Sequence, residues 1–350
     1  MGKLISTLLF QPPNNPTSLP RSKYFWLKTS RGSQIPAFHI EQPHARFTVL
    51  YSHGNAEDLG MIYNYITELS RLLYVNIIAY DYTGYGLGTR HVQNIQNEKS
   101  ESSEENCYSD IEAAYAYLMD VKNIDPQQVI LYGRSVGSGP SCYLAQKLGI
   151  ELGEFGLGGM ILHSPFVSVC RVVVDLGLEN KFDFFPNVSR IKDVTCPTFI
   201  IHGTKDSVVP FYHGRMMFDN LSEGIRYKPF WAEAMGHNNI EADMCSMFIK
   251  KLQRFFLYVL KTQNPAISRS ERLAERIKPQ VEIVINGTPL KVVADESVPK
   301  AKLERNISPR AISDAFDDKG MDNSDHSTCV SSLDGEFEFG EIECLILSEL

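Results

Sequence analysis

The sequence predicts an α/β fold in which a mainly parallel sheet is covered by helices on both faces. Apolar runs with strand character alternate with amphipathic helical patterns between residues 24 and 261. The runs are apolar throughout, as expected of strands that are buried on both faces. Polar residues suited to catalysis stand directly after several of these runs. In open α/β sheets active sites gather at the carboxyl ends of the strands, so a site is expected at that edge.

The elements can be placed in order along the chain. An irregular, proline-containing arm at 11–22 comes first, and a polar surface loop is expected between Leu87 and Glu105. Short apolar runs predict strands at 49–52, 75–80, 129–132, 160–163, 197–202 and 227–231. Apolar residues at helical spacing predict helices at 59–73, 104–119, 137–148, 210–220 and 239–259.

Length and composition exclude several classes of protein. The 350 residues are 43% hydrophobic and 22% charged, which is ordinary for a globular chain and excludes disorder throughout. No stretch approaches the ~18 unbroken apolar residues of a membrane span. The net charge of −8 makes nucleic acid a poor partner, because binding it needs clustered Lys and Arg.

The charge is unevenly distributed along the chain. Residues 1–261 carry 24 basic and 25 acidic side chains, residues 262–310 carry 9 and 6, and residues 311–350 carry 1 and 11. The acidity therefore belongs to the last forty residues, which is typical of a folded body followed by an acidic tail.

These patterns predict three parts. An N-terminal arm is expected at 1–23, a folded α/β domain at 24–261 and a C-terminal extension at 262–350. The extension holds either a small hairpin near 281–293 or an isolated apolar patch there. After it we expect a disordered acidic tail.

The cysteines and the N-terminus indicate where the protein resides. The seven cysteines are irregularly spaced, odd in number and include no C-x-x-C pair, and no signal peptide is evident. Free thiols in a reducing compartment are therefore expected.

Residues 1–6 read MGKLIS, which fits the acceptor pattern for myristoylation of Gly2 after removal of Met1. The alternative is a chance match, expected in roughly 1% of chains. A single myristoyl chain gives only marginal membrane binding, with K ~10⁴ M⁻¹. We expect a peripheral protein on the cytoplasmic side of membranes. A weak basic patch could come from Lys3, Arg21, Lys23, Lys28 and Arg31.

The sharpest motif is GRSVG at 133–137, directly after one expected strand and directly before a helix. This is the strand–turn–helix setting of a nucleophile elbow, in which a tight, strained turn exposes the hydroxyl of Ser135. The residues two positions away are small because strand and helix approach closely there. The alternative is a glycine-rich turn with an idle serine. In this setting the motif predicts a nucleophile.

A serine hydroxyl needs a base and an orienting acid, which follow in the chain order Ser, Asp, His. Asp206 comes after the next-but-one strand and is the candidate acid, with a helix N-cap as the alternative role. His237 lies after the last strand and before the final helix, and is the candidate general base and acid.

Two backbone N–H groups are expected to bind the oxyanion. One is that of Val136, directly after the nucleophile. The other comes from the loop at 52–58, where Gly54 lets the backbone approach the substrate and the donor is either Asn55 or Ala56. Asp81, after the following strand, is expected to be structural.

The remaining histidines show no metal-binding spacing, because the chain has no H-E-x-x-H and no Cys/His cluster. No metal or cofactor is expected. His53 and His202 should hydrogen-bond neighbouring loops, and His163 is expected to be structural or to line the substrate site. The others are expected on the surface: His39, His44, His91, His213 and His326.

Seven segments together carry a family resemblance. They are HGNAEDLG at 53–60, YDYTGYG at 80–86, GRSVG at 133–137, HSP at 163–165, FDFFPN at 182–187, HGTKD at 202–206 and GHNNIE at 236–241. The set closely resembles the α/β-hydrolase-domain-containing 17 family over residues 35–260. The resemblance implies the α/β-hydrolase fold with a short cap and a triad of Ser135, Asp206 and His237. It also implies removal of palmitate from protein cysteines at membranes.

The sequence departs from that family in three places. The N-terminal cysteine cluster by which family members are palmitoylated is missing, and Gly2 stands there instead. The loop at 87–99 looks like an insertion. The tail beyond about Lys261 has no recognised counterpart.

An apolar segment at 166–190 lies where hydrolases of this fold insert a cap. It is rich in Val, Leu and Phe, and the acyl-pocket candidates in it are Phe166, Phe182, Phe184 and Phe185. A sixteen-carbon chain would gain up to ~0.8 kcal/mol per buried CH₂ on such a surface. The alternative, that these residues simply cover the sheet, has equal support.

The expected function is therefore a serine hydrolase that cleaves acyl thioesters on lipid-modified proteins. S-acylated proteins would be its substrates, and a membrane surface would be reached through the N-terminal lipid. Two alternatives remain open: an ester or acylglycerol lipase of the same fold, and a non-catalytic membrane-associated adaptor. The sequence leaves the oligomeric state open.

Overall fold

The computed structural model describes residues 9–88, 101–153, 156–173 and 183–263, together with the backbone of two strands at 282–285 and 288–291. The chain divides into two units, residues 1–259 and 260–350. Gly2, Phe182, most of the polar loop and the acidic tail lie outside the described residues.

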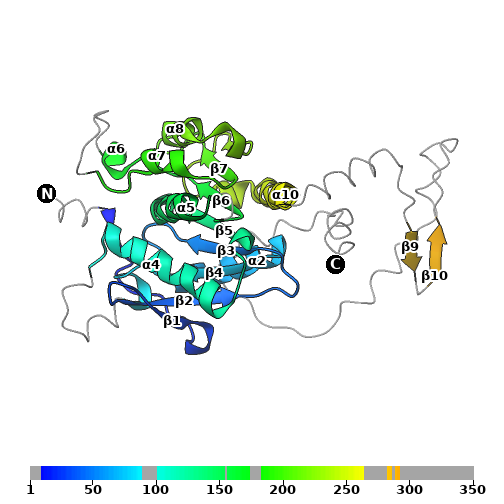
Figure 1. Ribbon diagram of the computed structural model, residues 1–350, viewed down its shortest axis with the longest axis horizontal. Coiled ribbons are helices and arrows are strands. Elements are labelled where there is room, and N and C mark those ends of the chain that lie inside the picture. Colours follow the sequence, from blue (N-terminus) through cyan, green and yellow to red (C-terminus); the bar gives the residue numbers. More distant parts are fainter. Residues whose placement is uncertain are drawn as a thin grey trace. The chain divides into compact units, whose positions relative to one another are not determined.

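The first unit is built on an eight-stranded sheet with the order β1-β2-β4-β3-β5-β6-β7-β8 (Figure 1). Its strands are β1 (Phe25–Lys28), β2 (Gln34–Ile40), β3 (Thr48–Ser52), β4 (Asn76–Tyr80), β5 (Val129–Arg134), β6 (Gly159–His163), β7 (Thr198–Gly203) and β8 (Phe230–Ala232). β2 is antiparallel to β1 and β4, and every pairing from β4 to β8 is parallel. The predicted fold class, an α/β-hydrolase sheet, is confirmed.

The register of the parallel strands brings their carboxyl ends together. Ser52 at the end of β3 pairs with Gly133 of β5, and Arg134 pairs with His163 at the end of β6. The segments that follow β3, β5, β6 and β7 therefore leave the sheet at one edge, where the chemistry of such folds is found.

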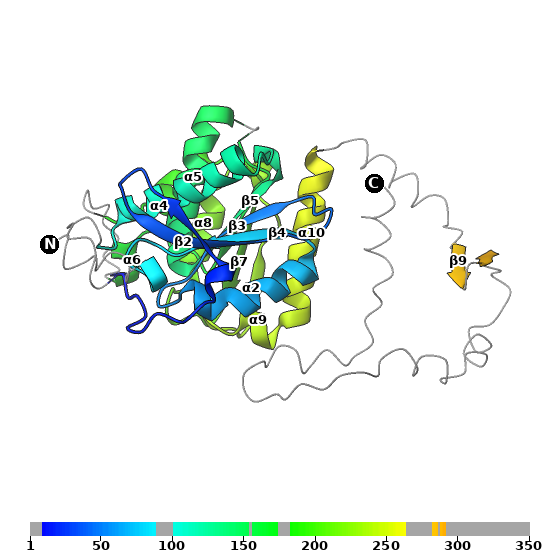
Figure 2. The same cartoon turned by 90° about the horizontal axis from the view of Figure 1, so that it is seen from below.

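Helices cover both faces of the sheet. They are α2 (Leu59–Leu73), α4 (Glu104–Ala116), α5 (Ser138–Leu152), α6 (Val169–Val173), α7 (Asn187–Arg190), α8 (Tyr212–Asn220), α9 (Ile240–Asp243) and α10 (Cys245–Gln263). α4 and α5 lie on one face, and α2 and α10 lie on the other (Figure 2). Asp58 caps α2 by accepting from the N–H of Met61, as an N-cap residue does.

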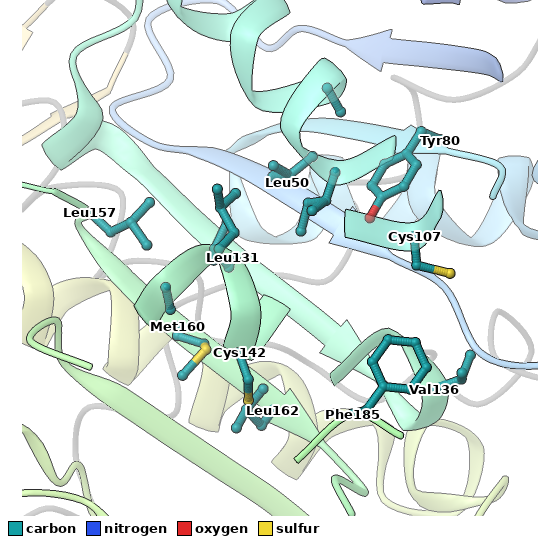
Figure 3. Packing of buried hydrophobic residues seen from close by; sticks show 14 of the residues in the cluster. Leu50, Tyr80, Cys107, Leu131, Val136, Cys142, Leu157, Met160, Leu162 and Phe185 are labelled. Carbon is teal, nitrogen blue, oxygen red and sulfur yellow. The ribbon is translucent and has the colours of Figure 1, made fainter. Parts of the chain in front are cut away.

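Both faces of the sheet are buried, which explains why the strand runs are apolar throughout. On the α5 side, Leu50, Leu131 and Leu162 are fully buried in one cluster (Figure 3). On the α10 side, the rings of Phe199 and Phe255 pack with centroids 5.5 Å apart. Burying one such side chain stabilises the fold by about 1.5–3 kcal/mol.

The predicted elements differ from the structure mostly at their ends. The helix expected at 59–73 has those bounds, whereas the one expected at 104–119 leaves α-geometry after Ala116 and continues as a π turn over Tyr117–Val121. The helix expected at 239–259 is divided into α9 and α10. The last strand begins at Phe230 rather than at residue 227.

The second unit contains two short strands, β9 (Glu282–Ile285) and β10 (Thr288–Lys291), that pair antiparallel with Ile285 opposite Thr288. They fall where the sequence left open a hairpin or an apolar patch.

Among the helices of the described residues, none is long and apolar enough to cross a membrane. The five cysteines of the described part are all free thiols.

Candidate active site

The loop between β5 and α5 holds Ser135 in a strained conformation. Its φ angle is +51°, in the left-handed region that residues with a side chain rarely adopt. A Cβ on Gly133 would lie 2.5 Å from the carbonyl oxygen of Gly137, and one on Gly137 would lie 2.1 Å from that of Ser52. Only glycine fits at both positions, so the sequence GxSxG produces the sharp turn that exposes the serine.

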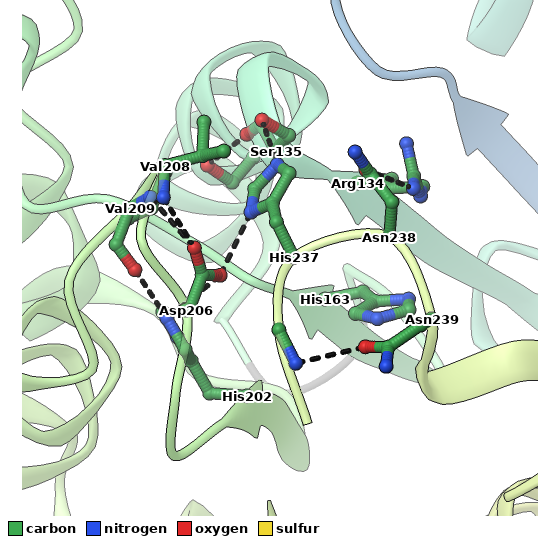
Figure 4. Close-up of polar contacts among 12 residues, drawn as sticks. Arg134, Ser135, His163, His202, Asp206, Val208, Val209, His237, Asn238 and Asn239 are labelled. Atoms are coloured by element: carbon green, nitrogen blue, oxygen red, sulfur yellow. Dashed lines mark hydrogen bonds and ion pairs between the residues drawn. The ribbon is translucent and has the colours of Figure 1, made fainter. Parts of the chain in front are cut away.

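Ser135, His237 and Asp206 form a hydrogen-bonded row (Figure 4). His237 Nε2 lies 3.0 Å from Ser135 Oγ, and His237 Nδ1 lies 2.7 Å from Asp206 Oδ2. The three residues come from the loops after β5, β8 and β7. The structure thus brings together the three residues that the sequence selected, in the order that a nucleophile, a base and an orienting acid require.

Asp206 is held as a carboxylate. Burial alone would raise its pKa, but hydrogen bonds from His202 and His237 and from the backbone of Val209 outweigh burial and hold the pKa well below its usual value. Asp206 Oδ1 accepts from the N–H groups of Val208 and Val209 at 2.9 and 2.8 Å. Asp206 Oδ1 therefore fixes the turn that follows and Oδ2 orients His237, whereas the alternative role of helix N-cap is not found, because α8 begins only at Tyr212.

The loop that carries His237 is fixed on both sides of the imidazole. Asn239 Oδ1 accepts from the N–H of Gly236 at 2.8 Å, and the N–H of Lys205 donates to the carbonyl of Met235 at 2.8 Å. The second contact ties this loop to the one that carries Asp206. The distance between base and acid is therefore set by backbone contacts as well as by their own hydrogen bond.

The structure distinguishes between Asn55 and Ala56, the two alternatives for the second oxyanion donor. Val136 is the second residue of the 3₁₀ turn Ser135–Gly137, where an N–H group has no acceptor within the turn. In the loop after β3, the N–H of Ala56 already donates to Asn55 Oδ1 at 3.1 Å. The backbone N–H of Asn55 is therefore the better candidate for the second donor.

The N-terminal arm contacts this same loop. Asn55 Nδ2 donates to the carbonyl of Leu9 at 2.6 Å, and Asn55 Oδ1 accepts from the N–H of Gln11 at 3.0 Å and from the hydroxyl of Tyr85 at 2.6 Å. Between them Phe10 is buried, with its ring 6.2 Å from that of Phe185. The sequence predicted an irregular arm and did not predict this docking.

Arg134, the second residue of the motif, was not singled out by the sequence analysis. Its guanidinium contacts Glu57 Oε1 at 2.7 Å, Glu241 Oε1 at 3.2 Å and Asn238 Oδ1 at 2.9 Å. Burial would lower its pKa, but the two carboxylates outweigh burial and raise it. These partners are 77 to 107 residues away in sequence, so no local pattern could have found them.

The other histidines are mostly structural. His53 Nδ1 lies 2.8 Å from the carbonyl of Gly54, and His202 Nε2 lies 2.8 Å from that of Val209, as expected for loop contacts. Burial lowers the pKa of His163 to about 4, and its Nδ1 lies 3.0 Å from the hydroxyl of Tyr132. His213 is fully buried and accepts from the N–H of Val167, so the expected surface position was wrong.

Of the four acyl-pocket candidates, two are buried in the core, one is half-buried and one lies outside the described residues. Phe185 is fully buried against Gly139, where an added Cβ would lie 2.3 Å from its ring, and Phe166 is 4% exposed in the same core cluster. These two residues fill the interior, and the interpretation that they cover the sheet holds for them. Phe184 is half-buried at the border of the core, and Phe182 lies outside the described residues.

In the described part of the chain, no group of three or more His, Cys, Asp or Glu side chains is placed to hold a metal ion. The groups that converge at the carboxyl edge of the sheet are a hydroxyl, an imidazole and a carboxylate, and the candidate oxyanion donors Val136 and Asn55 lie in loops that leave the same edge. Such an arrangement can activate a serine towards a carbonyl carbon.

Comparison with known proteins gives relatives in sequence and in structure. No family model matches the chain. Over 233 residues, 66% of this chain and 74% of the relative, it is 36% identical to human α/β hydrolase domain-containing protein 17B. Over 238 residues, 67% and 70% of the two chains, it is 36% identical to α/β hydrolase domain-containing protein 17C of Xenopus tropicalis.

Among solved structures, an esterase from Pyrococcus furiosus matches with a TM-score of 0.54 and 13% identity, over 71% of this chain and 99% of that chain. At this level of identity the likeness shows the fold alone.

Proposed function

The chain belongs to the α/β-hydrolase-domain-containing 17 family and is a hydrolase of that fold; from this premise and the geometry of its site, we propose that it hydrolyses acyl thioesters. Its substrates would be S-acylated proteins at a membrane surface, from which it removes a long acyl chain. The catalytic groups would be Ser135, His237 and Asp206.

The observation that carries the proposal is the hydrogen-bonded row itself. Ser135 stands on a strained turn with its hydroxyl 3.0 Å from an imidazole whose other nitrogen is 2.7 Å from a carboxylate. A positive φ angle costs of order 1–3 kcal/mol, so it is not expected at a serine that has no role in the site. Strain of this kind together with an oriented base supports a nucleophile.

In the first half of the reaction, Ser135 Oγ attacks the thioester carbonyl carbon while His237 Nε2 takes its proton. Asp206 stabilises the imidazolium that forms. The N–H groups of Val136 and Asn55 donate to the oxyanion. Loss of one such donor typically lowers the rate by about 10²–10³-fold. The C–S bond then breaks, the thiol leaves with the proton from His237, and Ser135 carries the acyl group as an ester.

In the second half, a water molecule attacks the ester carbonyl carbon while His237 takes a proton from that water. The new tetrahedral intermediate collapses, the fatty acid is released, and His237 returns the proton to Ser135 Oγ. Every proton taken by the imidazole is returned, so the enzyme is regenerated without a cofactor.

The choice of a thioester rests on the resemblance to the family and on leaving-group chemistry. A thiol has an ordinary pKa near 8.5, so its sulfur leaves readily once the tetrahedral intermediate has formed. An alkoxide is far more basic and depends more strongly on a proton from His237. The site therefore depends less on proton donation by His237 when it cleaves a thioester than when it cleaves an oxygen ester.

The direct test uses two matched peptides that differ only in a palmitoylated Cys or a palmitoylated Ser. We expect hydrolysis of the thioester at least ten times faster than the ester, with S135A inactive on both. Faster cleavage of the oxygen ester, or of a monoacylglycerol, would instead favour the acylglycerol lipase. A folded protein that neither turns over substrate nor reacts with a fluorophosphonate at Ser135 would favour the adaptor.

We also propose that Gly2 is myristoylated and holds the protein at the cytoplasmic side of a membrane. The MGKLIS sequence supports this, and one acyl chain gives the weak, reversible binding of a peripheral enzyme. In cells, Gly2→Ala should move the protein from membrane to soluble fractions while its activity on a small soluble ester is unchanged. An unchanged distribution between the fractions would remove the anchor from the account.

A further inference from the structure

Arg134 lies at the centre of a charged cluster beside Ser135. Its side chain is 12% exposed, and its guanidinium contacts three side chains, two from loops and one from α9. Buried arginines of this kind are costly unless their charge is compensated, and Glu57 and Glu241 supply two carboxylates here. Nothing in the hydrolytic steps described above uses these groups.

The first contact fixes the loop that carries the second oxyanion donor. Arg134 Nη1 binds Glu57 Oε1 at 2.7 Å, and the other oxygen of Glu57 accepts from the N–H of Gly54 at 2.7 Å. Asn55 stands between Gly54 and Glu57 in the chain. The Arg134–Glu57 pair therefore fixes the loop on both sides of Asn55, the residue whose N–H is expected to reach the oxyanion.

The remaining contacts fix the loop that carries the base. Arg134 Nη2 donates to Asn238 Oδ1 at 2.9 Å, next to His237 in the chain, and Nε lies 3.2 Å from Glu241 Oε1 in α9. Figure 4 shows Arg134 and Asn238 side by side, adjacent to His237. One guanidinium thus connects the serine turn, the oxyanion loop and the histidine loop.

We propose that Arg134 is a positioning residue that holds the oxyanion loop and the histidine loop in register with Ser135. The inference rests on the proposed function, because it assigns roles to Asn55 and His237. Arg134 has the right geometry for this, since a planar guanidinium offers several fixed donors at once and a lysine offers a single point charge.

The cluster also sets the charge near the base. His237 contacts Asp206, which His202 also contacts. His163 interacts electrostatically with His237 and also with Arg134 and Glu241, so these charges belong to the surroundings of the base. Without the guanidinium, Glu57 and Glu241 would stand beside the site uncompensated. Excess negative charge favours the protonated imidazole, which cannot act as a base, so activity would then need a higher pH.

The experiment compares R134Q and R134K with the natural chain on a small soluble ester. For R134Q we expect kcat to fall about 10- to 100-fold with little change in KM, as for a small displacement of catalytic groups. We also expect the acid limb of its pH–rate profile to move to higher pH. R134K keeps the charge, so its acid limb should stay in place while kcat falls in part.

Removing the carboxylate as well should reverse the pH effect. In the double variant R134Q/E241Q the acid limb should return towards that of the natural chain, an outcome that a merely structural role would not give. R71Q is the matched control, because it breaks an exposed Arg–Glu pair, with Glu68, within helix α2. Its kinetics should be unchanged.

The outcomes separate this inference from the proposed function. If S135A keeps its activity, the proposed function fails. If S135A is inactive but R134Q has the natural kcat and pH profile, only the role of Arg134 is overturned. Should R134Q fail to fold, N238A tests the histidine-loop contact alone: we expect a lower kcat with an unshifted acid limb, and an unchanged kcat would contradict the proposal.

Discussion

At the scale of single residues, the site depends on backbone positions that accept no side chain. Gly137 packs against the carbonyl of Ser52, and Ser135 adopts a φ angle of +51° because the turn between β5 and α5 is so tight. The sequence motif predicted this turn, because the spacing of its glycines follows from close approach of strand and helix.

Gly137→Ala should destabilise the protein, because the new methyl group would lie 2.1 Å from a backbone oxygen that cannot move alone. We expect a loss of about 3 kcal/mol or more in urea unfolding. Gly224→Ala is the matched control, since a Cβ there meets nothing within 4 Å, and its effect should stay within about 0.5 kcal/mol. Equal effects of the two substitutions would contradict the packing described.

Asp206→Asn should affect both rate and acid stability. We expect kcat to fall by roughly 10³–10⁴, as when the orienting carboxylate of a serine triad is neutralised. The folded protein depresses the pKa of Asp206, so the carboxylate stabilises the fold above its ordinary pKa of 3.8 and this stability is lost as the pH falls. Unfolding measured from pH 7 to pH 3 should therefore show the natural chain and the variant converging in acid.

At the scale of elements, sequence periodicity predicted the parallel strands and the long helices, because strands buried on both faces and amphipathic helices leave strong patterns. The antiparallel strands β1 and β2 were not among the predicted strands. What it missed depends on contacts distant in sequence. Arg134 and its partners, the burial of His213 and the docking of the N-terminal arm on Asn55 have no local signature. The motifs gave the triad because each of its members follows a strand.

The docked arm gives a test that separates anchoring from catalysis. Deletion of residues 2–11 removes Leu9, Phe10 and Gln11, which hold the Asn55 side chain and pack on Phe185. We expect kcat on a soluble ester to fall several-fold, because the oxyanion loop loses its support. The matched deletion of residues 2–8 leaves these contacts in place, and its kcat should match that of the natural chain. Equal kcat values for the two deletions would show that the arm does not support the site.

The contact between the loop after β4 and helix α4 should be sensitive to pH. Asp110 is fully buried, and burial raises its pKa to about 7 even though it accepts two hydrogen bonds from Thr83. A raised pKa means that folding favours the protonated acid, so this contribution to stability is lost as the pH rises from about 4 to 7, by at most about 4 kcal/mol.

Asp110→Asn removes the proton equilibrium while it can still accept one hydrogen bond from Thr83. Thermal unfolding between pH 5 and pH 8 should show a smaller loss of stability in this variant than in the natural chain. Parallel curves would mean that Asp110 does not titrate in this range.

At the scale of the whole molecule, the net charge of −8 belongs to the last forty residues, and the folded body is almost neutral. A neutral body can approach an anionic membrane without strong repulsion, whereas the acidic C-terminal residues would be repelled by it. The relatives match about two-thirds of this chain, and the second unit begins at residue 260. Sequence composition alone could not assign a role to that extension.

Truncation after Gln263 keeps all of α10 and removes the extension. Because Phe248, Leu252 and Phe255 bury α10 against the sheet, the shortened chain should fold and keep its activity on a soluble ester within about twofold. Loss of folding in the shortened chain, measured by thermal unfolding, would show that the hydrolase body depends on residues beyond 263.

The central claim is that Ser135 takes the acyl chain from a thioester. The most direct measurement mixes the purified protein with an S-palmitoyl peptide, quenches in acid at short times and locates the acyl group by mass spectrometry. We expect one palmitoyl group per chain on the peptide that contains Ser135, formed together with one equivalent of free thiol, and no adduct in S135A. Thiol release by S135A at the natural rate, or an acyl group on another residue, would contradict the account.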